Sequence, residues 1–388
     1  MTPRLRHRYA LVGLGEAGLG RAREGESATT LQARAARLAM LDAGLRPGDI
    51  DAVFSHWDEK AQAMLMAEYL GLAPRHVDTT LVGGQSSLTH VVHAIAAMEA
   101  GLCEVALITY GSTQRLDRSR SPAGQQVDPR SPVGQFVQPF GLPSPIGFYA
   151  MQAELHHHRH GTGPEDLATF AIAAREWAAL NEKIAAPEPL TLEEYLAAPM
   201  ICAPLRKHDI CRVQDGAGAV ILTRLEHARD LARPLIEVLG FAETFRHHMA
   251  PLAPVDWLES GHIPRLTDEA LAMAGRTRAD LDIVEIYDAF TIGVLCGLEE
   301  LGFAAPGEGA AFAREAGIGP GGRFPINTSG GGLAFNHSGM FGMQLLIETI
   351  EQLRQTAGRR QVAGAETALM LAGGIVNSAH HVMVLGRA

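Results

Sequence analysis

The sequence predicts a duplicated α/β protein in which two similar halves each place a sheet against helices. Three observations lead to this expectation. The chain opens on a strand, a helix and a second strand, a segment near residue 43 recurs near residue 274, and each half has a glycine-rich entry into a long helix. With 388 residues, 47% of them hydrophobic, the chain is long enough to bury a large core or two fused cores.

The first observation is the pattern at the N-terminus. It predicts a strand, a helix ending at Gly44 and a second strand, at residues 9–12, 29–43 and 50–55. Gly13, Gly15 and Gly18 follow the first strand with the spacing of a dinucleotide-binding loop. The residues after them continue as a loop where such a site would begin its helix, so the sequence favours an ordinary strand-exit turn.

An internal repeat is the second observation. Residues 43–53 (AGLRPGDIDAV) match residues 274–284 (AGRTRADLDIV), an offset of 231. The helix end, the turn, the acidic pair and the strand recur together. The same offset places His56 opposite Tyr287, so both halves deliver a polar ring to equivalent strand ends, where α/β proteins commonly form their sites.

The glycine-rich helix entries are the third observation. In each half the sequence predicts such an entry, then an apolar helix and a strand, at residues 82–86, 88–100 and 104–110, and at residues 330–332, 340–353 and 367–372. Two sheets that share buried helices would account for all three observations.

The boundary between the halves is expected near residue 230. We assign residues 1–230 to the first half and residues 231–388 to the second. A segment rich in Pro, Gly, Ser and Arg begins a loop excursion from the first half at about 113–205. The other elements expected in this part of the chain are two helices, a turn and a strand, at residues 149–158, 164–180, 215–219 and 220–223.

Composition and charge limit the class of protein. A net charge of −10 argues against a general nucleic-acid surface, which needs clustered Lys and Arg. Apolar runs fall short of the roughly 20 residues of a membrane span and the start lacks a secretory signal, so we expect a cytoplasmic protein without a nucleic-acid or membrane partner. The cysteines are too scattered for a metal or redox motif and are expected to be reduced thiols: Cys103, Cys202, Cys211 and Cys296. The histidine cluster at 156–160 is expected to be a solvated helix end.

Five segments in order along the chain resemble those of the thiolase superfamily. They are residues 11–16 (LVGLGE), 174–181 (AREWAALN), 214–217 (QDGA), 284–291 (VEIYDAFT) and 327–331 (NTSGG). The chain is most similar to the branch of sterol-carrier-protein-x thiolases and bacterial lipid-transfer-protein thiolase homologues. The resemblance implies the thiolase fold, a five-layered αβαβα arrangement that is usually dimeric. It also implies an acyl-CoA substrate with coenzyme A as substrate moiety, no permanently bound cofactor, and, as a candidate partner, a small zinc-ribbon and OB-fold protein.

The resemblance also locates the thiolase nucleophile. Its position, at the start of the helix after the third strand, holds Gly84, and the second family cysteine would fall in residues 370–374, where none is present. An acyl-cysteine is therefore not expected. The glycine-lined helix start would still hold an enolate through backbone N–H groups. A serine nucleophile there would need an adjacent base, and a serine after glycines is commonly a helix cap. The substrate-binding residues expected at these two places are Gly84, Gln85, Ser86 and Gly374.

Two further motifs supply candidate catalytic groups. His337, in the segment NHSG, resembles the histidine of the family's Gly-His-Pro loop, which acts on the thioester or the nucleophile. Tyr287, in YDAF, stands where sterol-carrier thiolases have histidine and resembles a catalytic tyrosine of bacterial retro-aldolases that cleave steroid side-chain CoA esters. Those enzymes have a second tyrosine in the later glycine loop, which His337 replaces here. The alternatives are a histidine that bonds only the backbone and a strand-end tyrosine that only packs.

His56 is the third candidate catalytic residue, because the repeat places it opposite Tyr287. The other candidate substrate-binding residues come from the glycine loops and the last strand: Asn327, Gly331, Gly332, Ser338 and His380. Four arginines of the excursion either reach the CoA phosphates or are simply solvated: Arg115, Arg118, Arg120 and Arg130.

These residues favour an enzyme that makes or breaks a carbon–carbon bond next to a CoA thioester without an acyl-enzyme. We expect a retro-aldol cleavage of a β-hydroxyacyl-CoA in lipid or sterol-type catabolism, in which Tyr287 moves the hydroxyl proton and His337 polarises the thioester oxygen. An acetyl-CoA acetyltransferase or other acyltransferase with an unrecognised nucleophile is one alternative. A non-catalytic subunit that binds lipid or acyl-CoA esters, or scaffolds a partner, is the other.

Overall fold

A nine-stranded mixed sheet organises the chain in a computed structural model that describes residues 7–56, 60–119, 128–142, 145–228, 234–245, 261–374 and 376–388. The strand order is β3-β2-β4-β7-β1-β8-β11-β10-β9. The strands are β1 (Tyr9–Gly20), β2 (Ala52–His56), β3 (His76–Asp78), β4 (Val105–Ser112), β7 (Asp215–Arg224), β8 (Ile236–Phe245), β9 (Ile283–Ile286), β10 (Thr367–Gly374) and β11 (Ala379–Arg387). A separate pair consists of β5 (Met200–Cys202) and β6 (Leu205–Arg206).

The sheet consists of two parts that meet at β1 and β8. The first five strands in the order belong to the N-terminal part of the chain and the last four to the C-terminal part. A short antiparallel ladder joins them, in which Ala10 pairs with Glu237 and Leu11 with Ile236. The two sheets expected from the sequence are therefore continuous through this ladder.

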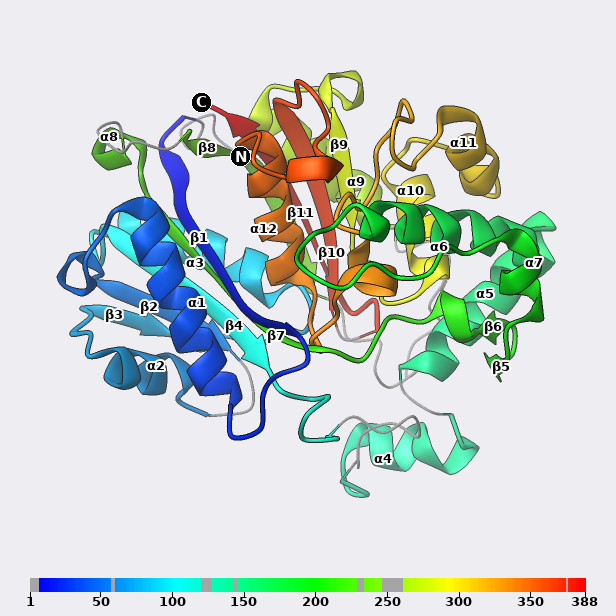
Figure 1. Cartoon of the computed structure of the whole chain (residues 1–388), viewed down its shortest axis with the longest axis horizontal. Helices are drawn as coiled ribbons and strands as arrows, with labels where there is room; N and C mark the ends of the chain where they lie inside the picture. The colour runs from blue at the N-terminus through cyan, green and yellow to red at the C-terminus, as the bar shows by residue number, and fades with distance from the viewer. Residues whose placement is uncertain are drawn as a thin grey trace.

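Helices form three layers around the two parts of the sheet, as the predicted αβαβα arrangement requires. Helices α3 (Ser86–Glu99) and α12 (Gly342–Leu353) contact each other and strands of both parts, so they form the central layer (Figure 1). The outer layers are α1 (Ala28–Ala43) and α2 (Gln62–Leu70) on the first part, and α9 (Ile263–Ala274) and α10 (Thr291–Glu300) on the second.

The described part of the expected excursion contains several helices. It contains α4 (Pro132–Phe136), α5 (Ile146–His160), α6 (Pro164–Ala179) and α7 (Leu192–Ala197), and the last three lie together at the right of Figure 1, beside α10. The remaining α-helices that the structure describes are α8 (Leu225–Ala228) and α11 (Gly309–Ala316). No helix among the described residues combines the length and the apolar character needed to cross a bilayer.

The sequence repeat corresponds to a repeated set of hydrogen bonds. Asp51 accepts a hydrogen bond from the amide of Val105 (2.9 Å), and Asp282 accepts one from the amide of Thr367 (2.9 Å). Each aspartate thus ties the turn before one strand to the start of its parallel neighbour, β4 beside β2 and β10 beside β9. The two halves therefore form equivalent strand ends at His56 and after Ile286.

Two predicted turns are wrong, because the glycines in them lie inside strands. Strand β1 continues through Gly13 and Gly15, where a Cβ atom would collide with backbone carbonyls of α1. These glycines let the helix approach the strand closely. The expected turn at 215–219 is likewise part of β7, where Ala217 pairs with Ala17 of β1.

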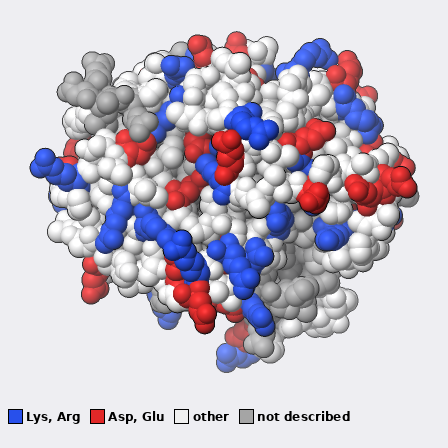
Figure 2. Space-filling view, in the orientation of Figure 1, with Lys and Arg blue, Asp and Glu red and all other residues white. Residues whose placement is uncertain are grey.

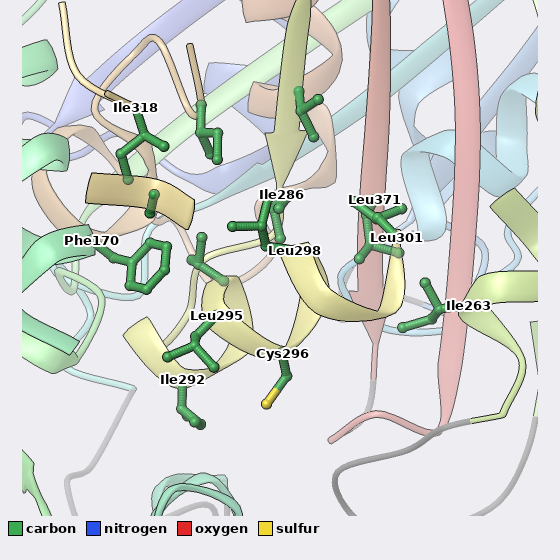
Figure 3. Close-up of a cluster of buried hydrophobic side chains, with 14 of the residues drawn as sticks. Phe170, Ile263, Ile286, Ile292, Leu295, Cys296, Leu298, Leu301, Ile318 and Leu371 are labelled. Atoms are coloured by element: carbon green, nitrogen blue, oxygen red, sulfur yellow. The ribbon is translucent and has the colours of Figure 1, made fainter. Parts of the chain in front are cut away.

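A hydrophobic cluster between the second part of the sheet and the excursion holds the end of β9 in place. Figure 3 shows Ile286 of β9 and Leu371 of β10 against the apolar side chains of α10, among them Ile292 and Leu295. All four side chains are at least 95% buried. Because Tyr287 follows Ile286 directly, this packing fixes where its side chain begins.

The expectation of a solvated helix end at 156–160 is wrong for its first histidine. His156 is buried, and its ring nitrogens lie 2.8 Å from the Thr162 hydroxyl and 3.0 Å from the Glu299 carboxylate. It therefore joins α5 to α10, while His158 and His160 are exposed. The helix continues through the cluster, so one of its faces is buried.

Candidate active site

Tyr287 and His337 lie in direct contact at the centre of the molecule. Tyr287 follows β9, and His337 follows a π-helical turn at Gly331–Phe335. The Tyr287 hydroxyl oxygen is 3.2 Å from Nε2 of His337 and accepts a hydrogen bond from the Phe341 amide (3.1 Å). The two rings meet edge to face, with centroids 5.7 Å apart. Both residues that the sequence ranked first therefore form one pair.

The loop after His337 determines the protonation of its ring. The Gly339 amide donates to Nδ1 of His337 (3.2 Å), so this nitrogen is an acceptor. In the neutral imidazole the proton is then on Nε2, which faces the Tyr287 oxygen. The phenol oxygen accordingly accepts two hydrogen bonds and keeps its own proton available for a substrate.

The Tyr287 ring fills the space in which a side chain at residue 84 would lie. A Cβ atom built on Gly84 would be 2.5 Å from the Tyr287 oxygen and 2.5 Å from Cζ. The carbonyl of Gly84 also accepts a hydrogen bond from the amide of Gly342 at the start of α12 (3.0 Å). A Cβ atom built on Gly374 would lie 3.2 Å from the backbone nitrogen of Gly84. The entries to both central helices thus converge on the phenol.

Asp288 shapes the glycine loop that precedes His337. Its carboxylate accepts hydrogen bonds from the amides of Gly332 (2.7 Å) and Leu333 (3.1 Å). Burial raises the pKa of Asp288 to about 7, while the backbone hydrogen bonds work in the opposite direction. Gly331 has φ = 63°, and a Cβ there would collide with the same carboxylate. Asp288 therefore acts as an acceptor for backbone amides.

Asn327 and Ser338 support the backbone around this pair. The Asn327 side chain accepts from the Ile286 amide (2.7 Å) and donates to the Ile286 carbonyl (2.9 Å), directly before Tyr287. The Ser338 hydroxyl accepts from the Gln344 side chain (3.3 Å). These contacts favour positioning roles for two residues that the sequence suggested for substrate binding.

Ser86 closes the turn before α3 and does not form the expected helix cap, because the helix has no side-chain cap hydrogen bond and its N-cap residue is Gln85. The Ser86 hydroxyl donates to the Gly83 carbonyl (2.6 Å) and accepts from the Val82 amide (2.9 Å), so it closes the turn before the helix. This engagement argues against a nucleophile, because the hydroxyl proton is bound to a backbone carbonyl and not to a base. Gln85, the next candidate, is fully buried at the N-cap position.

The ring of His56 contacts Tyr110 and does not contact Tyr287 or His337 among the ring contacts of the described residues. Its imidazole stacks on Tyr110, with centroids 4.9 Å apart, and meets His90 edge-on at 5.1 Å. Burial, reinforced by His90, holds the pKa of His56 well below its usual value. Tyr110, in turn, binds the loop after His337. The structure therefore brings Tyr287 and His337 together and places His56 behind Tyr110.

A cavity of about 60 Å³ opens beside Tyr287, between the excursion and the turn from β10 to β11. His380 lines it, as does Gly373, which pairs with His380 across the strands. Its polar wall includes Tyr149, whose hydroxyl is 3.4 Å from Asn377. A substrate group in this cavity would contact Tyr287.

A larger cavity of about 510 Å³ lies between α6 and the segment before β7. Its lining includes the cations Arg175, Lys207 and Arg212, and also His208, whose pKa is lowered by burial. Cys211 and Leu333 line it as well, and Leu333 belongs to the glycine loop that Asp288 holds. On the face shown in Figure 2, basic and acidic side chains are interspersed.

Of the arginines chosen from the sequence, those that the structure describes do not line this cavity. Arg115 donates to the Gly20 carbonyl (3.0 Å) and to the Gln214 side chain (2.5 Å), and Arg130 pairs with Asp128 at 3.1 Å on the surface. Arg118 is exposed, and Arg120 lies outside the described residues. The basic cavity was missed because its cations come from separate segments without a common motif.

Comparison with known proteins places the chain in a family. The model of the family described as thiolase C-terminal domain-like matches residues 247–387. A 17-hydroxy-3-oxo-4-pregnene-20-carboxyl-CoA lyase of Mycobacterium tuberculosis is 31% identical over 376 residues, which cover 94% of this chain and 96% of that protein. The chain belongs to the thiolase superfamily. A steroid side-chain-cleaving aldolase of Thermomonospora curvata is 30% identical over 359 residues, 90% of each chain.

Solved structures of the thiolase superfamily show the same fold. The structure of an Ltp2-ChsH2(DUF35) aldolase superposes with a TM-score of 0.88 at 28% identity, over 99% of this chain and 98% of that one. Human mitochondrial 3-ketoacyl-CoA thiolase, at 17% identity and a TM-score of 0.72, shows the fold alone. The predicted membership in the sterol-carrier and lipid-transfer branch is confirmed. In this chain Gly84 lies against the Tyr287 ring.

Proposed function

We propose that the protein cleaves a β-hydroxyacyl-CoA by a retro-aldol reaction, without an acyl-enzyme. One observation carries the proposal: the Tyr287 phenol, hydrogen-bonded to His337, occupies the space of a side chain at residue 84. A nucleophilic side chain at residue 84 would have no room, whereas Tyr287 and His337 can act there as an acid–base pair. The similarity to enzymes named as a steroid CoA-ester lyase and a steroid side-chain-cleaving aldolase supports the same chemistry.

In this mechanism the Tyr287 phenolate takes the proton of the β-hydroxyl group. The bond between the α and β carbons breaks, its electron pair enters the thioester as an enolate, and the β carbon leaves as an aldehyde or ketone. As the enolate forms, the Nε2 proton of His337 moves its hydrogen bond from the Tyr287 oxygen to the enolate oxygen, and backbone N–H groups at the start of α3 add further stabilisation. The Tyr287 proton then returns to the α carbon, so the reaction balances without a cofactor.

The basic cavity supports a CoA ester as substrate. Arg175 and Arg212 are half-buried cations, and guanidinium groups bind phosphates with paired hydrogen bonds. Leu333 connects this cavity to the glycine loop, so a pantetheine chain passing along it would deliver the thioester toward His337. The phosphates of CoA are the groups that we assign to the cavity.

A partner protein and a second copy of the chain belong to the same proposal. The similar aldolase structure is named for two components, Ltp2 and ChsH2(DUF35). We infer that a small protein of the second kind assists turnover here. The homodimer and the cytoplasmic location also stay predictions.

The test is incubation of the purified protein, alone and with the product of any adjacent gene for such a partner, with β-hydroxyacyl-CoA and β-ketoacyl-CoA esters. Mass spectrometry identifies the products. A carbonyl compound and a shortened acyl-CoA are expected from the hydroxy esters. Thiolysis of the keto esters with free CoA would instead indicate an acyltransferase, and binding without turnover a non-catalytic subunit.

A further inference from the structure

Buried aromatic rings of the first half reach the loop that carries His337. Tyr110, in β4, is fully buried. Its hydroxyl donates to the Ser338 carbonyl (2.5 Å), 228 positions further along the chain, and accepts from the Met340 amide (2.9 Å). Two strong hydrogen bonds from one phenol thus hold the backbone on the C-terminal side of the catalytic histidine.

The same loop is bound by a second phenol from the other half. Tyr287 accepts from the Phe341 amide (3.1 Å), next to the Met340 amide that Tyr110 binds. Between these contacts, the Gly339 amide donates to Nδ1 of His337 (3.2 Å). The shape of the loop therefore decides where the His337 ring points and which of its nitrogens carries the proton.

His56 gives the Tyr110 ring its support. The rings of His56 and Tyr110 stack with an interplanar angle of 15°. His90 packs edge-on against His56. Burial lowers the pKa of both imidazoles, to about 4 for His90, so they pack as neutral rings near pH 7. Because all three rings are at least 99% buried, Tyr110 has little room to turn away from the loop.

We propose that Tyr110, supported by the stacked ring of His56, is a positioning residue that sets the orientation of His337 for catalysis. The role of His56 in this arrangement is that of a ring and not of a proton carrier. The inference rests on the proposed function in that His337 is taken to act on a thioester. The contacts themselves exist without substrate, which allows a separate test.

The first measurement needs no substrate. Tyr110→Phe keeps the stacked ring and removes only the hydroxyl, and Tyr9→Phe is the matched control, because Tyr9 is also fully buried and its hydroxyl binds Glu99 far from the loop. Native-state hydrogen exchange of the amides at 339–341 should quicken by about tenfold in Tyr110→Phe and not in Tyr9→Phe. Exchange that is equal in the two variants would overturn the proposal.

The second measurement uses turnover. Tyr110→Phe should lower kcat by about tenfold or more, with KM within about threefold, since the misplaced group acts on the reaction and not on binding. His56→Ala should cause a similar loss, and His56→Phe should recover most of that loss because it restores the stacked ring. An unchanged kcat in Tyr110→Phe, or equal losses in the two His56 variants, would contradict the proposal.

The two measurements separate this inference from the proposed function. If the wild-type protein cleaves no β-hydroxyacyl-CoA, the proposed function fails, and the exchange experiment still decides whether Tyr110 holds the loop. If the wild type is active and the loop exchanges equally in both tyrosine variants, only the positioning role fails. Thermal unfolding of each variant identifies a general loss of stability.

Discussion

Opposing effects act on the Tyr287 phenol. Its oxygen accepts hydrogen bonds from His337 and Phe341, which stabilise a phenolate. Desolvation acts against them and raises its pKa well above the usual value of 10.0. At neutral pH Tyr287 is therefore a phenol, and in the proposed mechanism only the small fraction that has lost its proton acts as the base for cleavage.

Removing the phenol oxygen tests this role most directly. Tyr287→Phe should lower kcat for cleavage by at least about a hundredfold, because the ring stays and the acid–base group is lost. His337→Ala should cause a loss of similar size by removing the donor to the enolate oxygen. Tyr9→Phe is the control for a lost buried hydroxyl. A Tyr287→Phe enzyme with near-normal steady-state rates would contradict the assignment.

The raised pKa of Tyr287 predicts a direction for the pH dependence. Below its pKa the phenolate fraction grows about tenfold with each pH unit, so kcat/KM for cleavage should rise from pH 7 to pH 9 without a plateau. The residual activity of Tyr287→Phe should lack this slope. Stopped-assay rates across this range provide the check, and a flat profile for the wild type would rule out a phenolate base.

At the scale of elements, the site depends on how closely the helix entries approach the strand end. Gly84, Gly342 and Gly374 meet where a Cβ on any of them would strike a neighbour. Glycine is required there for space and not for turns, because only the absent side chains let the segments touch. The position after β9 can therefore hold a large ring.

The contact between Gly84 and Tyr287 predicts a non-additive pair of mutations. Gly84→Ala should cost about 1–3 kcal/mol of unfolding free energy by overpacking. Tyr287→Ala makes room for the new methyl group. The double variant should therefore lose at least about 1 kcal/mol less unfolding free energy than the two single variants lose together. The control is a second cycle that combines Tyr287→Ala with Gly48→Ala, because a Cβ on Gly48 has open space around it. The effects in this control cycle should be additive. Urea unfolding measures all the variants, and additivity in the first cycle would contradict the predicted contact.

The glycine loop gives a second prediction at this scale. Gly331→Ala should lower stability by about 1–3 kcal/mol and also lower kcat, because φ = 63° is strained for alanine and its Cβ would collide with Asp288. Gly25→Ala has a similar positive φ of 84° with open space around it, so it should show strain without the loss of kcat. Equal kcat values in the two variants would show that the shape of the glycine loop does not affect catalysis.

For the whole molecule, the sequence predicts functional residues that lie in short motifs. It does not predict roles that depend on contacts between distant segments. Tyr287 and His337 lie in short motifs and could be found singly. Tyr110 could not, because its role comes from a contact with Ser338, 228 positions away. Gly13 suggested a turn because the close approach of α1 is visible only in three dimensions. The division of the halves at residue 230 stays a prediction.

The basic cavity is a second feature that exists only in the assembled molecule. Arg175 comes from α6 and Arg212 from the segment before β7, and the two are brought together by the folding of the excursion onto the glycine loop. Arg212 donates to the Ala334 carbonyl of that loop (2.8 Å), and Arg175 to the Glu188 carbonyl (3.0 Å). Each guanidinium therefore has a fixed position and donors left for an anion.

Neutralising this cavity should weaken binding without changing the chemistry. Arg175→Gln and Arg212→Gln should each raise KM for a β-hydroxyacyl-CoA by about tenfold, with kcat within about twofold, since a charge-assisted hydrogen bond to phosphate contributes about 1.5–3 kcal/mol. Arg130→Gln removes a surface cation paired with Asp128 and serves as control. The corresponding pantetheine thioester carries no nucleotide phosphates, so its KM should be the same for all these enzymes. A KM that rises equally for both substrates would mean that the cavity binds the acyl chain or only shapes the loop, and the phosphates would then have to lie elsewhere.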